Sequence, residues 1–238
     1  MKIQKMRVYC EVYEQGLETK DYLISVLQEK EIVCDIDIIY TKKVRGEFLP
    51  NESIVTRIRK IKDIDIMVTV LSEGKEIPIV LIEYSTAVPT DDHIMQRSDV
   101  VYWSAKFKVP SLKISPLNKG MANEHGGGDK ITDEFEKRVA IKNNAVYYTL
   151  KWQCNEDNDV LLTNDNRLSC IPYSSTLRNY FLKMVDSFIA ADSHFAYFDK
   201  LFKDYKSENA ALKKGLLVSE VSEMFPGCRR SVALRHRA

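Results

Sequence analysis

The sequence predicts an α/β protein, because short segments rich in β-branched residues alternate with segments of helical periodicity along the chain. Of its 238 residues, 45% are hydrophobic and 29% are charged, which is typical of a globular protein with a sizeable core. No apolar run approaches the roughly 20 residues that a membrane span needs. The length allows one good-sized domain or two small ones.

Charge and cysteine usage narrow the expected environment and partners. The N-terminal residues lack the uninterrupted apolar stretch of a signal peptide, and the five cysteines are dispersed without any CxxC pair. We therefore expect a cytoplasmic protein without structural zinc or a disulfide framework. The formal net charge is only +1, but basic residues crowd positions 42–62 and 229–237, and such local patches can bind a phosphate backbone.

The first third of the chain predicts four elements. Residues 2–13 fit a strand or a short helix, and Thr19–Lys30 fits a helix with Thr19 as its N-cap. Residues 32–40 predict a strand whose acids, Asp35 and Asp37, share one face. They form either a rival site or, as we favour, the polar side of an edge strand. A loop then leads to a helix over residues 54–61.

The central stretch, residues 61–85, predicts two apolar strands joined by a turn at residues 72–75. Asp63 or Asp65 begins the first strand, and Glu83 and Ser85 lie at the end of the second. A carboxylate that ends a buried apolar run is costly unless it is paired or bound to a metal. Two carboxylates, one from each arm of a hairpin, could hold a hard cation such as Mg²⁺.

The rest of the chain continues the alternation. A turn at residues 86–90 precedes a helix over 91–106 and a strand over 109–115. A glycine-containing loop follows, and its Gly126-Gly127-Gly128 lacks the spacing of a P-loop, so no nucleotide cofactor is expected. Residues 132–225 predict a second unit: a helix over 133–141, a hairpin from 145–153 and 159–163, and a long helical region over 174–205. The aromatic residues of that region suit a core or a dimer interface.

An acid at the start of one strand, followed by a second acid at the end of the next, resembles the PD-(D/E)XK nuclease superfamily. The matching pieces are Ile64-Asp65 and Glu83-Tyr84-Ser85, within a helix and strand order that agrees with the αβββαβ core of that superfamily. Two features depart from the pattern. No proline precedes the first acid, and Ser85 stands where the family usually has lysine.

The resemblance implies a restriction-endonuclease-like fold. Its αβββαβ core, with a mixed central sheet, would occupy residues 1–117, and a loop would follow at 118–131. The mostly helical unit, residues 132–225, would serve DNA recognition or dimerisation, and residues 226–238 would form a basic tail.

The implied activity is Mg²⁺-dependent hydrolysis of DNA phosphodiester bonds, with one or two ions. The size of the chain favours a type II restriction enzyme that acts on double-stranded DNA as a homodimer. Two alternatives stay open: a catalytically inactive DNA-binding or assembly protein with the same core, and a repair or structure-specific nuclease.

The resemblance also implies site residues. The carboxylates of Asp65 and Glu83 and the carbonyl of Tyr84 would bind metal, with Asp63 as the alternative to Asp65 and Glu52 or Glu47 as a third ligand. Gln96 could orient the water. Because Ser85 cannot supply the usual positive charge, the candidates for that role are Lys106, Lys113 and Arg97. The catalytic residues that the resemblance implies are thus Asp65, Glu83, Ser85, Gln96 and Lys113. The residues expected to contact DNA are Lys42, Lys43, Arg45, Arg57, Lys60 and Arg97.

Overall fold

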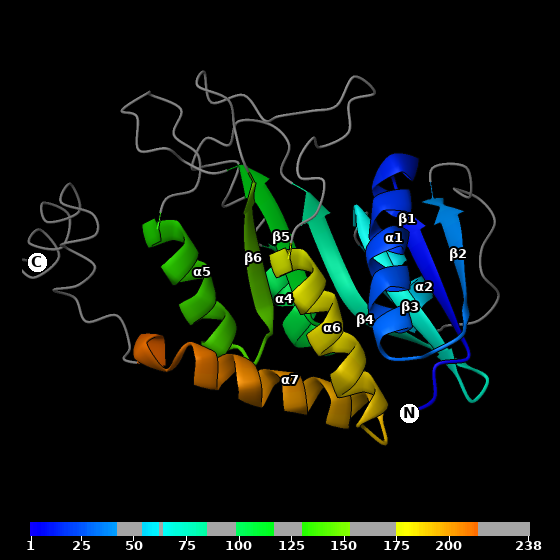
Figure 1. The fold of residues 1–238 in the computed structure, drawn as a ribbon. Coiled ribbons are helices and arrows are strands. Elements are labelled where there is room, and N and C mark those ends of the chain that lie inside the picture. Colours follow the sequence, from blue (N-terminus) through cyan, green and yellow to red (C-terminus); the bar gives the residue numbers. More distant parts are fainter. Residues whose placement is uncertain (42–53, 62–63, 85–98, 117–129, 153–174, 214–238) are drawn as a thin grey trace, which may run out of the picture.

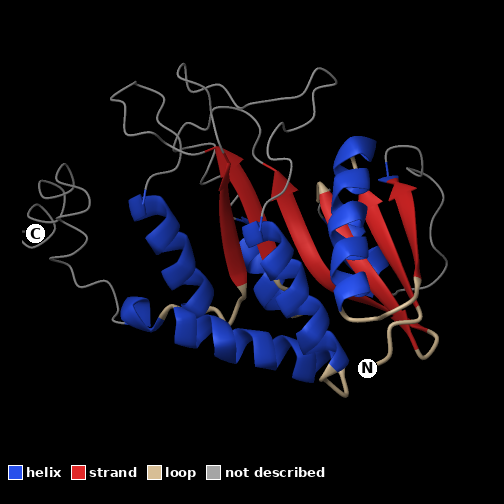
Figure 2. Cartoon of the chain, in the orientation of Figure 1, coloured by secondary structure: helices blue, strands red, loops and turns tan. Residues whose placement is uncertain are grey.

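The computed structural model describes residues 1–41, 54–61, 64–84, 99–116, 130–152 and 175–213. They form an α/β fold around a mixed six-stranded sheet with strand order β2-β1-β3-β4-β5-β6 (Figure 1). Helices cover both faces of the sheet (Figure 2). The predicted α/β class is thus confirmed. Among the described helices, none combines the length and the apolar character that crossing a membrane requires.

The N-terminal residues form a parallel strand pair with a helical crossover. β1 (Lys5–Cys10) and β2 (Asp35–Tyr40) are parallel, and α1 (Tyr13–Glu29) connects them. The strand alternative for residues 2–13 is therefore the correct one. The predicted N-cap is wrong, because α1 begins at Tyr13 and buries Thr19, whose hydroxyl donates to the Gln15 carbonyl at 2.8 Å. β2 is an edge strand, as expected, and its Asp37 pairs with Lys5 at 2.7 Å.

The centre of the sheet is the hairpin that the sequence predicts. α2 (Ile54–Ile61) precedes β3 (Ile66–Ser72), which pairs antiparallel with β4 (Lys75–Tyr84). The turn residues Glu73 and Gly74 both have positive φ, 51° and 73°, and glycine adopts this conformation without a steric penalty. β3 also pairs antiparallel with β1, so β1 lies between β2 and β3. Both hairpin strands are covered on their two faces, and most of their side chains are buried.

The second half of the sheet is parallel. β4, β5 (Ser111–Pro116) and β6 (Tyr147–Trp152) run in the same direction, and the helices α4 (Asp99–Phe107) and α5 (Lys130–Lys142) lie between them in sequence. The predicted helix over 91–106 is described only from Asp99 onwards, and the predicted strand over 159–163 lies outside the described residues. β6 is the edge strand of the same sheet that contains the β3–β4 hairpin.

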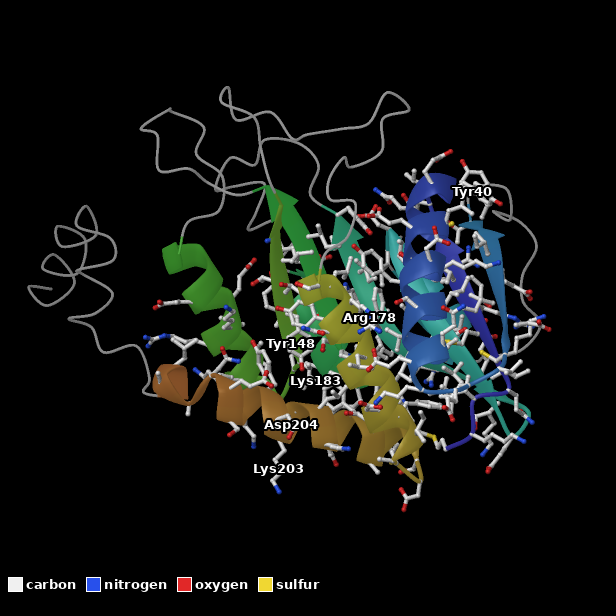
Figure 3. The ribbon with its side chains drawn as sticks, in the orientation of Figure 1. Tyr40, Tyr148, Arg178, Lys183, Lys203 and Asp204 are labelled. Atoms are coloured by element: carbon white, nitrogen blue, oxygen red, sulfur yellow. The ribbon has the colours of Figure 1, made fainter. Side chains whose placement is uncertain are left out.

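The predicted helical region over 174–205 is two helices, α6 (Ser175–Ile189) and α7 (His194–Glu208), followed by a short 3-10 helix, η2 (Ala210–Lys213). The break falls before Ser193, whose side chain caps α7 by accepting from the Ala196 N–H at 3.2 Å. α6 packs against α1, and its Arg178 donates to the Ser25 hydroxyl at 3.0 Å (Figure 3). The Tyr197 hydroxyl of α7 donates to the Ile79 carbonyl of β4 at 2.6 Å. These helices therefore complete the core around the sheet.

Side-chain contacts assign the helices to the two faces. Tyr148 of β6 stacks on Tyr180 of α6, whereas its neighbour Tyr147 bonds to Glu136 of α5. Because successive side chains of a strand point to opposite faces, α5 lies on the face away from α6. α1 packs with α6, while α2 and α4 pack with each other and α4 packs with α5. We refer to the side of α2, α4 and α5 as the α5 face.

Candidate functional site

Asp65 lies immediately before β3 and is bonded to both neighbouring strands. Its side-chain Oδ2 accepts from the backbone N–H of Tyr84 at 2.7 Å, at the end of β4. Its backbone carbonyl accepts from the N–H of Glu11 at 2.9 Å, just after β1. The Asp65 carboxylate is thus fixed against the peptide that joins Glu83 to Tyr84.

The hairpin register fixes the position of Glu83. Ile66 is opposite Ile82, so one further step along each chain brings Asp65 opposite Glu83. Directly opposite residues of an antiparallel pair point to the same face. Glu83 is only 8% exposed. The register therefore places Asp65 and Glu83 opposite one another at the open end of the hairpin, on the α5 face.

Lys113 continues this row on the next strand. It is the register partner of Glu83 in the parallel β4–β5 pair, so it also points to the α5 face. It is 2% exposed, and its Nζ lies 2.8 Å from Oε1 of Glu136 on α5. The second oxygen of Glu136 accepts from the Tyr147 hydroxyl at 2.6 Å. We call Asp65, Glu83 and Lys113 the strand-end row.

The side chain of Tyr84 belongs to the other face. It is buried near α1, and this burial, together with the negative charge of Glu18, raises the pKa of its phenol well above the usual value. Its hydroxyl therefore stays protonated, and only the backbone of Tyr84 lies beside the Asp65 carboxylate. This agrees with a ligand role for its carbonyl, which stays a prediction.

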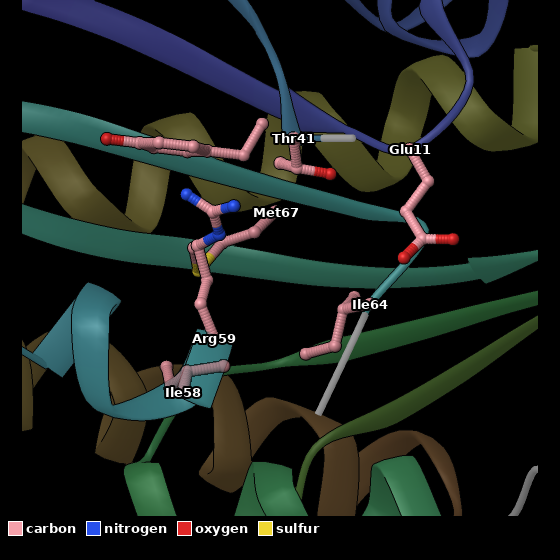
Figure 4. A pocket seen from close by; sticks show the side chains of 7 residues that line it. Glu11, Thr41, Ile58, Arg59, Ile64 and Met67 are labelled. Carbon is pink, nitrogen blue, oxygen red and sulfur yellow. The ribbon is translucent and has the colours of Figure 1, made fainter. Parts of the chain in front are cut away.

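A pocket opens beside the row, between α2 and the ends of β1 and β3 (Figure 4). Arg59 of α2 lies over the ring of Tyr9, 5.5 Å from its centroid, and Glu11 lies on the opposite side of the pocket. Sequence reasoning placed Arg59 only in the basic stretch over residues 42–62, and it missed Glu11. Glu11 is adjacent to Asp65 only because β1 pairs with β3, and the sequence contains no signal for that pairing.

The remaining predicted residues are distributed unevenly. Arg57 is exposed on α2, and Lys60 belongs to the same helix, although its side chain lies outside the described part. Lys106 of α4 lies over three aromatic rings of its own helix, so it is not in the strand-end row. The other predicted residues lie outside the described residues: Lys42, Lys43, Arg45, Glu47, Glu52, Asp63, Ser85, Gln96 and Arg97.

The donor chemistry of the row suits a hard cation. Within the described residues, no group of three or more histidine, cysteine, aspartate or glutamate side chains comes close enough to hold a metal ion. Mg²⁺ does not need such a cage, because it keeps several waters and binds through one or two carboxylates together with substrate phosphates. Asp65 and Glu83 carry carboxylate oxygens of the kind that such a site uses.

Comparisons with known proteins assign no relative to this arrangement. No protein-family model matches the chain, and neither does any curated protein or solved structure.

Proposed function

We propose that this chain is a Mg²⁺-dependent endonuclease that hydrolyses phosphodiester bonds of double-stranded DNA, with a restriction-endonuclease-like core of the PD-(D/E)XK type. The observation that carries the proposal is the bond from the Tyr84 N–H to Asp65, which ties the first acid to the strand end that holds Glu83. Lys113, aligned with Glu83 on the neighbouring strand, supports it further.

In this mechanism Asp65 and Glu83 would hold the metal, with the Tyr84 carbonyl as a further ligand. Mg²⁺ bound there would supply an activated water and would neutralise charge on the scissile phosphate. Lys113 stabilises the negative charge that develops on the phosphate, the role that Ser85 cannot fill. The Tyr84 N–H orients the Asp65 carboxylate, so this ligand is positioned before substrate arrives.

DNA contacts in this proposal come from basic residues near the row. Arg57 is exposed on α2, the helix that also carries Arg59 beside the pocket. Both would meet the phosphate backbone rather than specify the sequence. Within the superfamily we propose a type II restriction enzyme that acts as a homodimer, each protomer cutting one strand.

The test is incubation with unmethylated phage DNA and Mg²⁺, in parallel with EDTA and with the variant Glu83→Gln. The matched control is Glu73→Gln, an exposed acid in the turn at the other end of the same hairpin. We expect discrete Mg²⁺-dependent fragments that persist in the control and vanish in Glu83→Gln. Digestion restricted to branched or single-stranded DNA would assign a structure-specific nuclease instead.

A second candidate function is a DNA-binding or assembly protein that has the core without the chemistry. Two observations favour it: serine stands at position 85, and the Lys113 ammonium is held by Glu136. For this candidate we expect no cleavage in that assay at any Mg²⁺ concentration. A separate gel-shift assay should still show that the chain binds DNA.

A further inference from the structure

The ion pair between Lys113 and Glu136 is the most buried pair of opposite charges among the described residues for which a contact distance is known. The exposed fractions of the two side chains are 2% and 3%, and 2.8 Å separates Nζ from Oε1. The Tyr147 hydroxyl donates to the other oxygen of Glu136 at 2.6 Å. Both oxygens of this carboxylate are thus satisfied by groups from two adjacent strands, β5 and β6, beneath α5.

Such a pair is a poor device for stability. Removing two charges from water is costly, and apolar residues of similar volume often give an equally stable or a more stable protein. Lysine and glutamate are almost never fully buried unless they are paired. The pair therefore calls for a reason other than packing, and its position supplies one: Lys113 is the direct strand neighbour of Glu83.

We infer that Glu136 is a positioning residue that fixes the Lys113 ammonium beside the metal-binding carboxylates, with Tyr147 orienting Glu136. This inference rests on the proposed function. A lysine side chain has four rotatable bonds, so an ammonium without a fixed partner would sample many positions. Glu136 limits it to one, and the Tyr147 hydroxyl holds the carboxylate in the matching orientation.

Steady-state cleavage of linear double-stranded DNA by wild type, Glu136→Gln, Glu136→Asp and Glu134→Gln tests the inference. Glu134 is the matched control, because it lies on the same helix but about 200° around its axis from Glu136. We expect Glu136→Gln to lower kcat by about 10–100-fold and to leave KM for DNA unchanged. Glu136→Asp should recover part of the rate, and Glu134→Gln should match wild type.

A second measurement does not depend on activity. In protein labelled with ¹⁵N-lysine, an ordered and shielded ammonium gives an N–H signal that exchanges slowly with water. We expect this signal for Lys113 in wild type and in Glu134→Gln, and its loss in Glu136→Gln. The double variant Lys113→Met/Glu136→Leu keeps the buried volume apolar, so it should fold and bind DNA but not cleave it.

The outcomes separate the inference from the function on which it rests. Absence of Mg²⁺-dependent cleavage by wild type overturns both. Cleavage by wild type with an equal kcat for Glu136→Gln overturns only the positioning role. If Glu136→Gln does not fold, the double variant decides, because wild-type cleavage without Lys113 would overturn the inference.

Discussion

The two ends of the β3–β4 hairpin each hold carboxylates on the same face of the sheet, but different groups surround them. At the turn end, Glu76 Oε1 accepts from the hydroxyls of Tyr9 and Thr69, at 2.8 and 2.7 Å, and its Oε2 accepts from Arg7 at 3.0 Å. At the open end, Asp65 lies opposite Glu83 and accepts from the Tyr84 N–H at 2.7 Å, and Lys113 is the register neighbour of Glu83 on β5.

The difference indicates what each end does. A carboxylate surrounded by donors from neighbouring strands joins those strands and stabilises the sheet. Two acids placed opposite one another on neighbouring strands are a set of oxygen donors that could hold a hard cation, as the proposed function requires. The turn end therefore has the properties of a structural anchor, whereas the open end is where we propose that a metal binds.

The protonation state of Tyr9 agrees with the role of Glu76 as a structural anchor. Burial raises the pKa of the Tyr9 hydroxyl, and the negative charge of Glu76 raises it further. Tyr9 therefore remains a hydrogen-bond donor to Glu76 over the whole range of pH in which the protein would be studied.

The largest expected effect comes from exchanging the two acids for amides. Glu76→Gln should lower the free energy of unfolding by about 2–3 kcal/mol, because it removes a charge-assisted bond to Arg7 and turns an amide N–H towards donors. Glu83→Gln should change that free energy by less than about 1 kcal/mol, but lower cleavage by at least about 100-fold. Urea denaturation and DNA cleavage measure the two effects.

Glu73→Gln, in the exposed turn between the strands, is the control and should alter neither quantity. The comparison breaks down if Glu83→Gln proves more destabilising than Glu76→Gln, or if folded Glu76→Gln protein has lost cleavage.

A smaller effect is expected at Gly16, where α1 approaches β1. A Cβ at this position would lie 2.6 Å from the Cys10 Sγ and 3.2 Å from the Ile38 Cγ2. Gly16→Ala should therefore destabilise the protein by about 1–3 kcal/mol, although alanine favours a helix more than glycine does. Because Cys10 directly precedes Glu11, we also expect slower cleavage from a displaced strand end.

Gln28→Ala, on the exposed side of α1, is the matched control and should stay within about 0.5 kcal/mol of wild type. In a double-mutant cycle, Cys10→Ala should cost less in the Gly16→Ala background than alone, since it removes the clashing sulfur. If the Gly16→Ala protein were as stable as wild type, β1 and α1 would be able to move apart without a cost in folding free energy.

The smallest effect concerns His194, at the start of α7 and outside the hairpin. Burial lowers the pKa of its imidazole below 6.5. The unfolded chain then binds a proton more readily than the folded one as the pH falls, so the stability present above pH 6.5 decreases below it. Thermal unfolding of wild type and His194→Gln between pH 7.5 and 5.5 should show a steeper decrease for wild type.

His194 also tests whether a change in cleavage is specific to substitutions in the hairpin. Stability lost through His194 should leave the cleavage rate of the folded protein unchanged. Equal pH slopes for wild type and His194→Gln would contradict the assignment of the slope to this imidazole.

The sequence alone determined most of the local structure. β-branched runs and helical periodicity depend on neighbouring residues, so they predicted the helix at residues 54–61, the hairpin and its turn, and the strand of β5. The approach of Asp65 to the Glu83–Tyr84 peptide did not follow from the turn alone, because the register shifts by one residue between Val68 and Thr69. This irregularity brings Asp65 opposite Glu83, whereas the register of the turn would have brought it opposite Ile82.

Only the tertiary structure decided which strands became neighbours. The sequence does not show that β1 lies between β2 and β3, and hence it does not show Glu11 beside Asp65. Lys113 was one of three candidate cations, and the β4–β5 register alone aligned it with Glu83. Glu136 and Tyr147 drew no attention in the sequence, because their role depends on a helix and a strand that meet only in the folded core. Strand order and burial depend on packing between segments that are distant in sequence. Local propensity therefore predicts neither of them.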